Sequence, residues 1–266
     1  MKDLRVNEEY LSKEEISEWN ERNIIYNTLW FYVYKSKLKP DIEYSNQAIE
    51  IYRSNTFYNT WDCYQRSKKD GCILVKPDKM KFNADLMTGW WNPFKKFVNW
   101  NSRKQIVENI KNGNVPSKND KDILNWLMIR SKANEKECES LIEFMRMIYT
   151  AGNIIPAPLN WRGNGPDTWD YKLFEIIKNT TLTANKWNEY ICKYEGENRE
   201  AKLKKFISVN HLEMYFSNLD QLQLKQLWGK ENAVWTKATK SEWAEYFNNA
   251  KNCIEERTNK ITSSKS

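Results

Sequence analysis

Glycine and proline are scarce in this chain, with eight Gly and seven Pro among 266 residues. Sandwiches and barrels need a tight turn about every ten residues, and doubly wound folds need glycine-rich phosphate loops. The scarcity disfavours both classes and favours long helices. We predict a mainly α fold, a single compact multi-helix domain with at most a small β-hairpin near 71–83 and a long ordered loop at 150–168.

Aromatic residues supply the material for the core. The chain has 13 Trp, 14 Tyr and 10 Phe, and at 266 residues it is long enough to bury a sizeable core. We find no repeat and no linker rich in Gly, Pro or Ser, so we expect one domain over 1–261. Residues 262–266 are expected to form a disordered tail.

Apolar spacing and capping residues locate the helices. Capping boxes occur at Ser12/Glu15 and at Thr239/Glu242. The short apolar run 71–75 is expected to be a strand paired with residues near 80–82, whereas 89–100 shows no clean period and is expected to be irregular. Helices are predicted at 12–37, 44–66, 102–112, 120–131, 134–149, 167–179, 183–195, 198–217 with a possible break, and 239–261.

Two helical stripes have the strongest apolar periodicity, one at 138–149 and one at 243–254. Asn134 is predicted to be the N-cap of the first helix, and Gly152 to end it in a left-handed conformation. We expect both stripes to be central to the core. The residues predicted to be buried are Leu141, Met145, Ile148, Phe247 and Ile254.

Several classes of protein are disfavoured by what the sequence lacks. It has no apolar stretch of about 20 residues that would span a membrane, and its first residues have no signal-peptide core. The five cysteines are scattered and never form a CxxC pair, which is typical of reduced thiols in the cytoplasm. Common nucleotide-binding and hydrolase motifs are missing, and the single histidine, His211, is expected to be packed or at the surface. We expect no metal and no cofactor.

Positive charge is concentrated in one part of the sequence. Residues 64–118 hold twelve Lys and Arg against four Asp and Glu, a net charge of +8, whereas the whole chain has +7. Aromatic residues are interleaved with these lysines. This combination suits nucleic acid, because cations neutralise phosphates and rings stack on bases. The candidate nucleic-acid-binding residues are Lys79, Lys81, Trp90, Trp91, Lys95, Lys96, Arg103 and Lys104.

The same residue types also build an ordinary lid over a core. Lysine stems pack on aromatic rings while their ammonium groups remain solvated. The sequence leaves both interpretations of the basic aromatic segment open.

A second candidate site is the segment 149–170, which lies between two predicted helices. Arginine can hold a phosphate or carboxylate, asparagine amides can orient a ligand, and aspartate can act as a base. The alternative is structural, since the two aspartates are also placed to cap and stabilise the next helix. The candidate ligand-binding residues are Tyr149, Asn153, Asn160 and Arg162, and the candidate catalytic residues are Asp167 and Asp170.

Over about its last 120 residues, which include most of the loop-centred C-terminal part 134–261, the chain resembles a known group of proteins. The run Tyr149–Pro156, the run Asn160–Gly163 and the pair Asp167 and Asp170 are similar to the signature of an uncharacterised family of helical proteins from bacteria and mobile elements. Arg257, Lys260 and Ile261 in the closing helix are a fainter match. Asn153, where the family has a small residue, and the spacing before Asn160 depart from the pattern. The family has no established activity, so the resemblance implies a shared fold and site but no reaction.

The leading hypothesis is a binding protein whose basic aromatic face engages nucleic acid or an acidic protein surface, in conflict between a host and mobile elements. A second hypothesis is an enzyme acting on a nucleotide or nucleic acid, with its site on the 149–170 segment. A third is a protein-interaction or inhibitory module that uses its many tryptophans at an interface.

Overall fold

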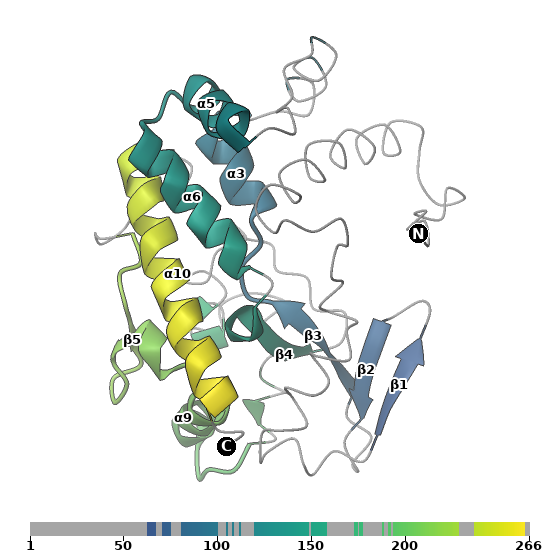
Figure 1. Ribbon diagram of the computed structural model, residues 1–266. Helices are drawn as coiled ribbons and strands as arrows, with labels where there is room; N and C mark the ends of the chain where they lie inside the picture. The colour runs from purple at the N-terminus through teal and green to yellow at the C-terminus, as the bar shows by residue number, and fades with distance from the viewer. Residues whose placement is uncertain are drawn as a thin grey trace. The chain divides into compact units, whose positions relative to one another are not determined.

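The protein is described by a computed structural model in which α3, α5, α6, α9 and α10 are the labelled helices (Figure 1). The chain divides into two compact units. The described residues of the first lie between Phe94 and Glu139, and the second comprises Pro40–Pro93 and Ser140–Ser266. The single-domain organisation stays a prediction. The structure describes residues 63–67, 71–75, 81–100, 120–148, 150–158, 194–228 and 237–263, and the single positions 105, 108, 112, 173, 174, 176, 177, 188, 191 and 192. Only the backbone is described up to residue 86 and at 120–122, 151, 154, 156–158 and 262.

The first unit contains most of α3 (Trp91–Phe97), α5 (Asp120–Ser131) and the start of α6 (Glu135–Met147). The prediction of a helix over 120–131 is confirmed. Asn134 is the N-cap of α6, as predicted: its side-chain oxygen accepts from the Glu137 backbone N–H at 2.9 Å, and the Glu137 carboxylate accepts from the Asn134 N–H at 2.9 Å. Both groups therefore satisfy amides that the first helical turn leaves without partners.

The prediction that residues 89–100 are irregular is wrong, because they include α3. Pro93 is compatible with this helix since it lies in the first turn, where its missing N–H would have no helical partner. Within the first unit, Phe94 stacks on Trp126 with ring centroids 6.4 Å apart. The edge of Trp100 meets both rings, at 5.8 and 5.7 Å.

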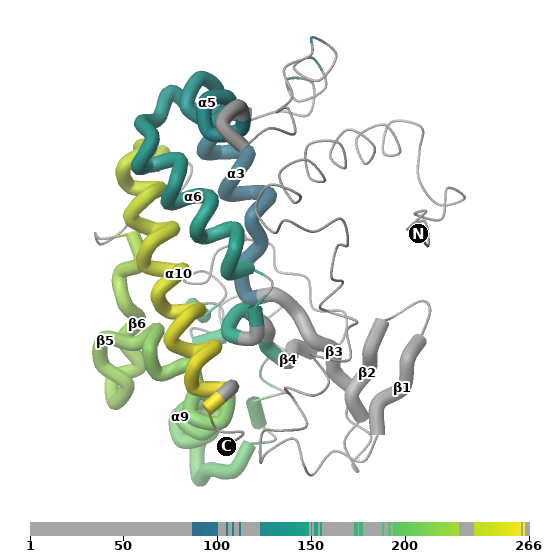
Figure 2. Tube along the Cα trace, viewed as in Figure 1, coloured from purple at the N-terminus to yellow at the C-terminus, as the bar shows by residue number. Residues whose placement is uncertain are grey.

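In the second unit, the end of α6 lies beside α10 (Lys240–Ser263), and the two run in the same direction (Figure 1 and Figure 2). Ser140 accepts a hydrogen bond from Asn248 at 3.2 Å, and Phe144 stacks on Phe247 at 5.0 Å. The five residues predicted to be buried in these helices are all at most 2% exposed, which confirms both stripes. The capping box of α10 is confirmed as well, with Thr239 and Glu242 exchanging hydrogen bonds of 2.8 and 3.2 Å.

Large rings fill the space around α10, as the aromatic content predicts. Trp228 stacks on Tyr246 at 4.5 Å and meets Trp243 edge-on at 4.6 Å. Tyr246 and Phe247 are both 0% exposed. The buried Tyr246 hydroxyl lies 3.5 Å from the Thr88 hydroxyl, so its polar end has a partner inside the core.

An antiparallel sheet of four strands, in the order β1-β2-β3-β4, accompanies these helices. The predicted hairpin is its centre, since Val75 pairs with Lys81. Two further strands complete the sheet. β1 overlaps the end of the helix predicted over 44–66, so that prediction is wrong at its end. β4 lies in the segment that was predicted to be a loop. The strands are β1 (Cys63–Ser67), β2 (Gly71–Val75), β3 (Lys81–Leu86) and β4 (Ile154–Pro158).

The segment before α10 contains α9 (Arg199–Val209), the 3₁₀ turn η5 (Glu213–Tyr215) and a hairpin of β5 (Phe216–Asn218) and β6 (Gln223–Leu224). The break predicted within 198–217 is therefore confirmed. Helices make up most of the described secondary structure, so the mainly α class is confirmed. Among the described helices, none is long and apolar enough to cross a membrane.

Candidate functional site

The structure describes the side chains of only some candidate residues: Asn153, Trp90, Trp91, Lys95 and Lys96. Lys81 is described by its backbone in β3. Tyr149, Asn160, Arg162, Asp167, Asp170, Lys79, Arg103 and Lys104 lie outside the described residues. The enzyme hypothesis, which depends on the 149–170 segment, therefore stays a prediction.

The described part of that segment is a 3₁₀ turn, η4 (Ala151–Asn153), followed by β4. The Asn153 side chain is 0% exposed, and it continues the hydrogen bonding between β3 and β4 just beyond the ends of these strands. Its Nδ2 donates to the Thr88 carbonyl at 2.8 Å, and its Oδ1 accepts from the Thr88 N–H at 3.2 Å. Nδ2 also donates to the Ile148 carbonyl, just past the end of α6, at 2.7 Å. Both amide hydrogens are thus used by backbone carbonyls, so we assign Asn153 a structural role in place of the predicted ligand contact.

Gly152 is not the left-handed helix end that the sequence predicted. Among the described glycines, only Gly196 has a positive φ. Gly152 is required instead by the close approach of α10, because an added Cβ would lie 2.0 Å from the Ile254 carbonyl oxygen. The Gly152 N–H donates to the Thr258 hydroxyl at 3.0 Å, which joins η4 directly to α10.

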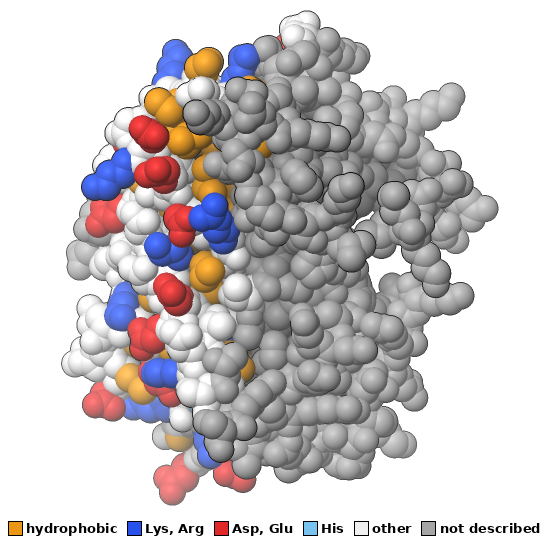
Figure 3. All heavy atoms as spheres, in the orientation of Figure 1, with side chains coloured by type: hydrophobic (Ala, Val, Ile, Leu, Met, Phe, Trp, Pro, Cys, Tyr) orange, Lys and Arg blue, Asp and Glu red, His pale blue; other side chains and the backbone are white. Residues whose placement is uncertain are grey.

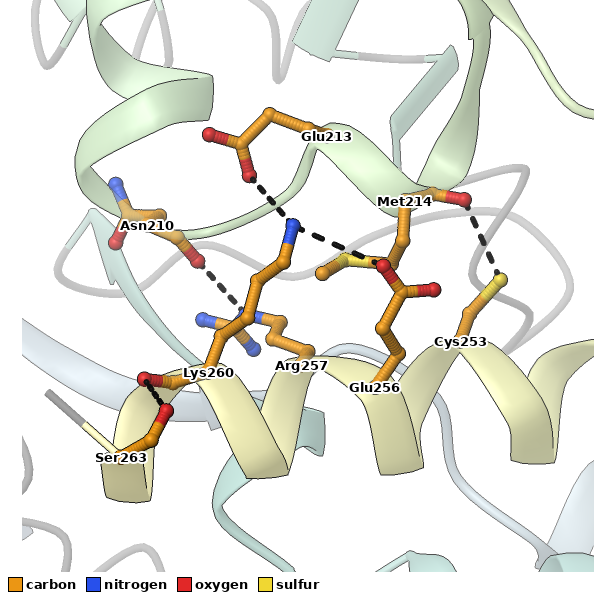
Figure 4. Close-up of polar contacts among 8 residues, drawn as sticks. All are labelled: Asn210, Glu213, Met214, Cys253, Glu256, Arg257, Lys260 and Ser263. Atoms are coloured by element: carbon orange, nitrogen blue, oxygen red, sulfur yellow. Dashed lines mark hydrogen bonds and ion pairs between the residues drawn. The ribbon is translucent and has the colours of Figure 1, made fainter.

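A buried arginine completes this arrangement (Figure 4). Arg257 on α10 is 2% exposed. Its Nε donates to the Asn210 carbonyl at 2.8 Å, and its Nη1 donates to the Gly152 carbonyl at 2.7 Å. One guanidinium thereby joins the end of α9, η4 and α10. We call the set Thr88, Gly152, Asn153, Arg257 and Thr258 the η4 anchor.

Charged groups lie next to Arg257 on the solvent side. The Lys260 ammonium is 3.7 Å from Glu256 and 4.0 Å from Glu213, with all three side chains partly exposed (Figure 4). His211 follows α9 with a φ of 50°, a left-handed conformation that costs a residue with a Cβ more than glycine. Burial lowers the pKa of His211; Glu213 opposes this effect, and Arg257 and Lys260 reinforce it. The sequence alone gave no sign that the single histidine ends a helix beside these groups.

The basic aromatic segment is described at α3, which has two distinct faces. Residues directed inward are Pro93, Phe94, Phe97 and Val98, all buried. Trp91 and Asn92 are partly exposed. In the first unit, the residues on the side opposite the buried ones are Lys95 and Lys96, partly exposed, and Asn99 in the turn after the helix, exposed; we call these three residues the α3 outer face.

The two neighbouring tryptophans differ in exposure. Trp90 is 3% exposed, so it belongs to the core and cannot stack on a base, which corrects the prediction for this residue. Trp91 is half-buried, and its ring meets Trp90 edge-on, with centroids 5.5 Å apart and planes at 85°. Of the predicted ring and lysine contacts, Trp91, Lys95 and Lys96 are partly exposed.

Comparison with known proteins gives no further assignment, since no family model, no curated protein and no solved structure matches this chain. Among the described residues, no group of three His, Cys, Asp or Glu side chains is placed to hold a metal ion. The expected absence of a metal or cofactor stays a prediction.

Proposed function

We propose that the protein is a nucleic-acid-binding protein and that the α3 outer face is part of its binding surface. The observation that supports this most is that Lys95 and Lys96 are both partly exposed, on the side of α3 opposite its buried residues. Lysines neutralise phosphates, amides can hydrogen-bond to phosphate or base edges, and an aromatic ring can stack on a base.

The distribution of charge favours the α3 outer face over the face of the molecule shown in Figure 3. On the face of the molecule shown in Figure 3, acidic and basic side chains are interspersed. On the α3 outer face both charged residues are lysines. The sequence around α3 extends the same sign, because residues 64–118 have a net charge of +8. An anionic polymer is the partner that such a segment attracts.

In the cytoplasm, where the scattered cysteines lead us to expect the protein, nucleic acids are abundant anionic polymers. The resemblance to proteins carried by mobile elements suits a partner of this class. We also propose a role in conflict between a host and mobile elements, which rests on that resemblance.

The test is fluorescence anisotropy with labelled oligonucleotides over a series of salt concentrations, using the variant Lys95→Gln/Lys96→Gln. Each lost phosphate contact on a single strand should reduce the slope of log K against log salt by about 0.7, so the pair should reduce it by about 1.4. The matched control is Lys205→Gln/Lys251→Gln, which removes two positive charges from α9 and α10 in the second unit. This control should keep the wild-type slope.

Equal binding by the wild type and the α3 variant would overturn the proposal, as would no binding by the wild type at low salt. Polyglutamate of similar length serves as the competitor for an acidic protein surface. Displacement of the oligonucleotide by polyglutamate at equal charge concentration would identify an acidic protein as the partner and reject nucleic acid.

A further inference from the structure

We infer that the turn over residues 207–212, between α9 and η5, is a pH-sensitive switch in which protonation of His211 weakens the contact between η5 and α10. All the residues involved lie in the second unit, so the switch is independent of the proposed nucleic-acid binding. Three features support it: the conformation of the turn, the groups around the His211 side chain and the contacts that hold η5.

The end of α9 closes in a turn that commonly contains glycine. The His211 N–H donates to the Ser208 carbonyl at 3.1 Å. The Leu212 N–H donates to the Ile207 carbonyl at 2.9 Å. These two bonds form the Schellman motif, which requires a left-handed residue at the position of His211. With a φ of 50°, the histidine meets this requirement at a cost that glycine would not have, so the turn is strained and is held by its surroundings.

A buried positive charge lies next to this turn. Arg257 of α10 is 2% exposed, and its Nε donates to the carbonyl of Asn210, the residue bonded to His211, at 2.8 Å. Burial is the largest cause of the lowered pKa of His211; Glu213 of η5 opposes it, and Arg257 and Lys260 of α10 reinforce it. Protonation therefore adds a positive charge beside two others, with one carboxylate to compensate it.

An ion pair joins η5 to α10 beside the histidine. The Lys260 ammonium lies 4.0 Å from the Glu213 carboxylate of η5 and 3.7 Å from Glu256 on its own helix (Figure 4). An imidazolium at His211 attracts Glu213 and repels Lys260, so it competes with the ion pair. The strained turn favours the same change, because its left-handed residue can relax once η5 moves away from α10.

Buried contacts keep η5 in place at neutral pH. Met214 and Tyr215 are 4% and 1% exposed, and the Met214 carbonyl accepts from the Cys253 thiol at 3.6 Å. Burial raises the pKa of that thiol to about 11, so it does not titrate with the histidine. Opening takes up one proton at His211 as pH falls below its ordinary pKa of 6.5, which raises the open population by at most about 10-fold per pH unit.

Hydrogen exchange of the full chain, measured by mass spectrometry between about pH 7 and pH 5.5 with and without low urea, tests the switch. In the wild type, residues 207–216 should have lower protection factors than residues 240–250 of α10. Their exchange should be nearly insensitive to urea, because local opening exposes little surface. Their protection should fall with pH. In His211→Asn this fall should be absent, since asparagine keeps the left-handed conformation but does not titrate.

Lys260→Gln removes the ion pair with which the imidazolium competes, so it should lower the protection of residues 207–216 already at pH 7. Lys251→Gln on the same helix is the matched control and should behave as the wild type. The thermal midpoint of each variant is recorded, so that exchange is compared on folded protein.

Equal protection and equal urea dependence for residues 207–216 and 240–250 would show that η5 leaves α10 only on global unfolding, and would overturn the switch. A wild-type pH dependence in His211→Asn would overturn it as well, because another group would then be its source. Unchanged protection in Lys260→Gln at pH 7 would contradict the role assigned to the ion pair.

Discussion

The η4 anchor and the α3 outer face are built from similar residues, yet their surroundings differ. Each combines a basic side chain with asparagine. In the anchor, Asn153 and Arg257 are 0% and 2% exposed, and their hydrogen bonds reach backbone groups of four separate segments. On α3, Lys95 and Lys96 remain half-buried at the border of the solvent. The first set joins parts of the fold, whereas the second is partly exposed.

The unpaired backbone groups at the ends of helices and strands account for this difference. The last carbonyl groups of a helix and the last peptide groups of a strand have no partner within their element and need one when they are buried. Ile148, Gly152 and Asn210 present such carbonyls next to the anchor, and Asn153 and Arg257 donate to them. In the middle of α3, by contrast, backbone N–H and carbonyl groups are paired with each other within the helix.

The largest expected effect comes from Arg257→Met. Methionine keeps much of the length of the side chain but donates to neither carbonyl, so at least two buried oxygens lose a charge-assisted hydrogen bond. We expect the free energy of unfolding to fall by about 3 to 5 kcal/mol. Chemical denaturation followed by tryptophan fluorescence measures it.

The control for Arg257→Met is Lys260→Met on the same helix, whose side chain is 43% exposed. It should cost less than about 1 kcal/mol, as exposed ion pairs do. Equal losses in the two variants would remove the distinction between the anchor and the surface around it.

A smaller loss is expected for Asn153→Ala. This change leaves the Thr88 and Ile148 carbonyls and the Thr88 N–H without the amide, and it should cost about 2 to 3 kcal/mol. Asn153→Asp should not restore stability, because a carboxylate would face the two carbonyl oxygens. Urea denaturation of both variants, with the exposed Asn252→Ala as the control, gives the comparison.

If Asn153 also contacts a ligand, Asn153→Ala would lose binding at temperatures where it is fully folded. Retained oligonucleotide binding under those conditions is the result we expect. Loss of binding by the folded variant would restore the ligand role that the sequence suggested.

For the α3 outer face, Lys95→Gln/Lys96→Gln should leave the free energy of unfolding within about 0.5 kcal/mol of the wild type, the usual range for surface substitutions. Both lysines are partly exposed, and glutamine is a good helix former. Denaturation midpoints in urea measure this. A loss above about 2 kcal/mol would indicate that these lysines are structural, like the residues of the η4 anchor.

Local signals predicted much of the fold. The capping pairs Asn134/Glu137 and Thr239/Glu242 form as the side-chain types and spacing require. The apolar stripes of α6 and α10 are buried because a helix places every third or fourth residue on one side. The hairpin β2–β3 was also predictable, since its strands are close in the sequence.

Features that depend on distant contacts could not be predicted in this way. β4 is a strand because it pairs with β3, as in Leu86 with Ile154, and its prolines favour a loop when it is considered alone. Trp90 and Trp91 are identical in type and adjacent, so only the packing of the fold distinguishes the buried residue from the partly exposed one. Asn153 was assigned to a ligand because the sequence does not reveal which backbone groups surround it.

The smallest expected effect concerns His211, at the edge of the η4 anchor. Because burial lowers its pKa in the folded protein from the ordinary 6.5, the unfolded chain binds more protons near that pH. The free energy of unfolding should therefore decrease as pH falls below 6.5, until the folded histidine is protonated as well. His211 is the only histidine in the sequence, so no other side chain with an ordinary pKa titrates there. His211→Asn should remove this slope and keep the left-handed backbone, which asparagine tolerates well. Urea denaturation in steps between about pH 7 and pH 5.5 measures both proteins, and an unchanged slope in His211→Asn would show that the histidine is not its source.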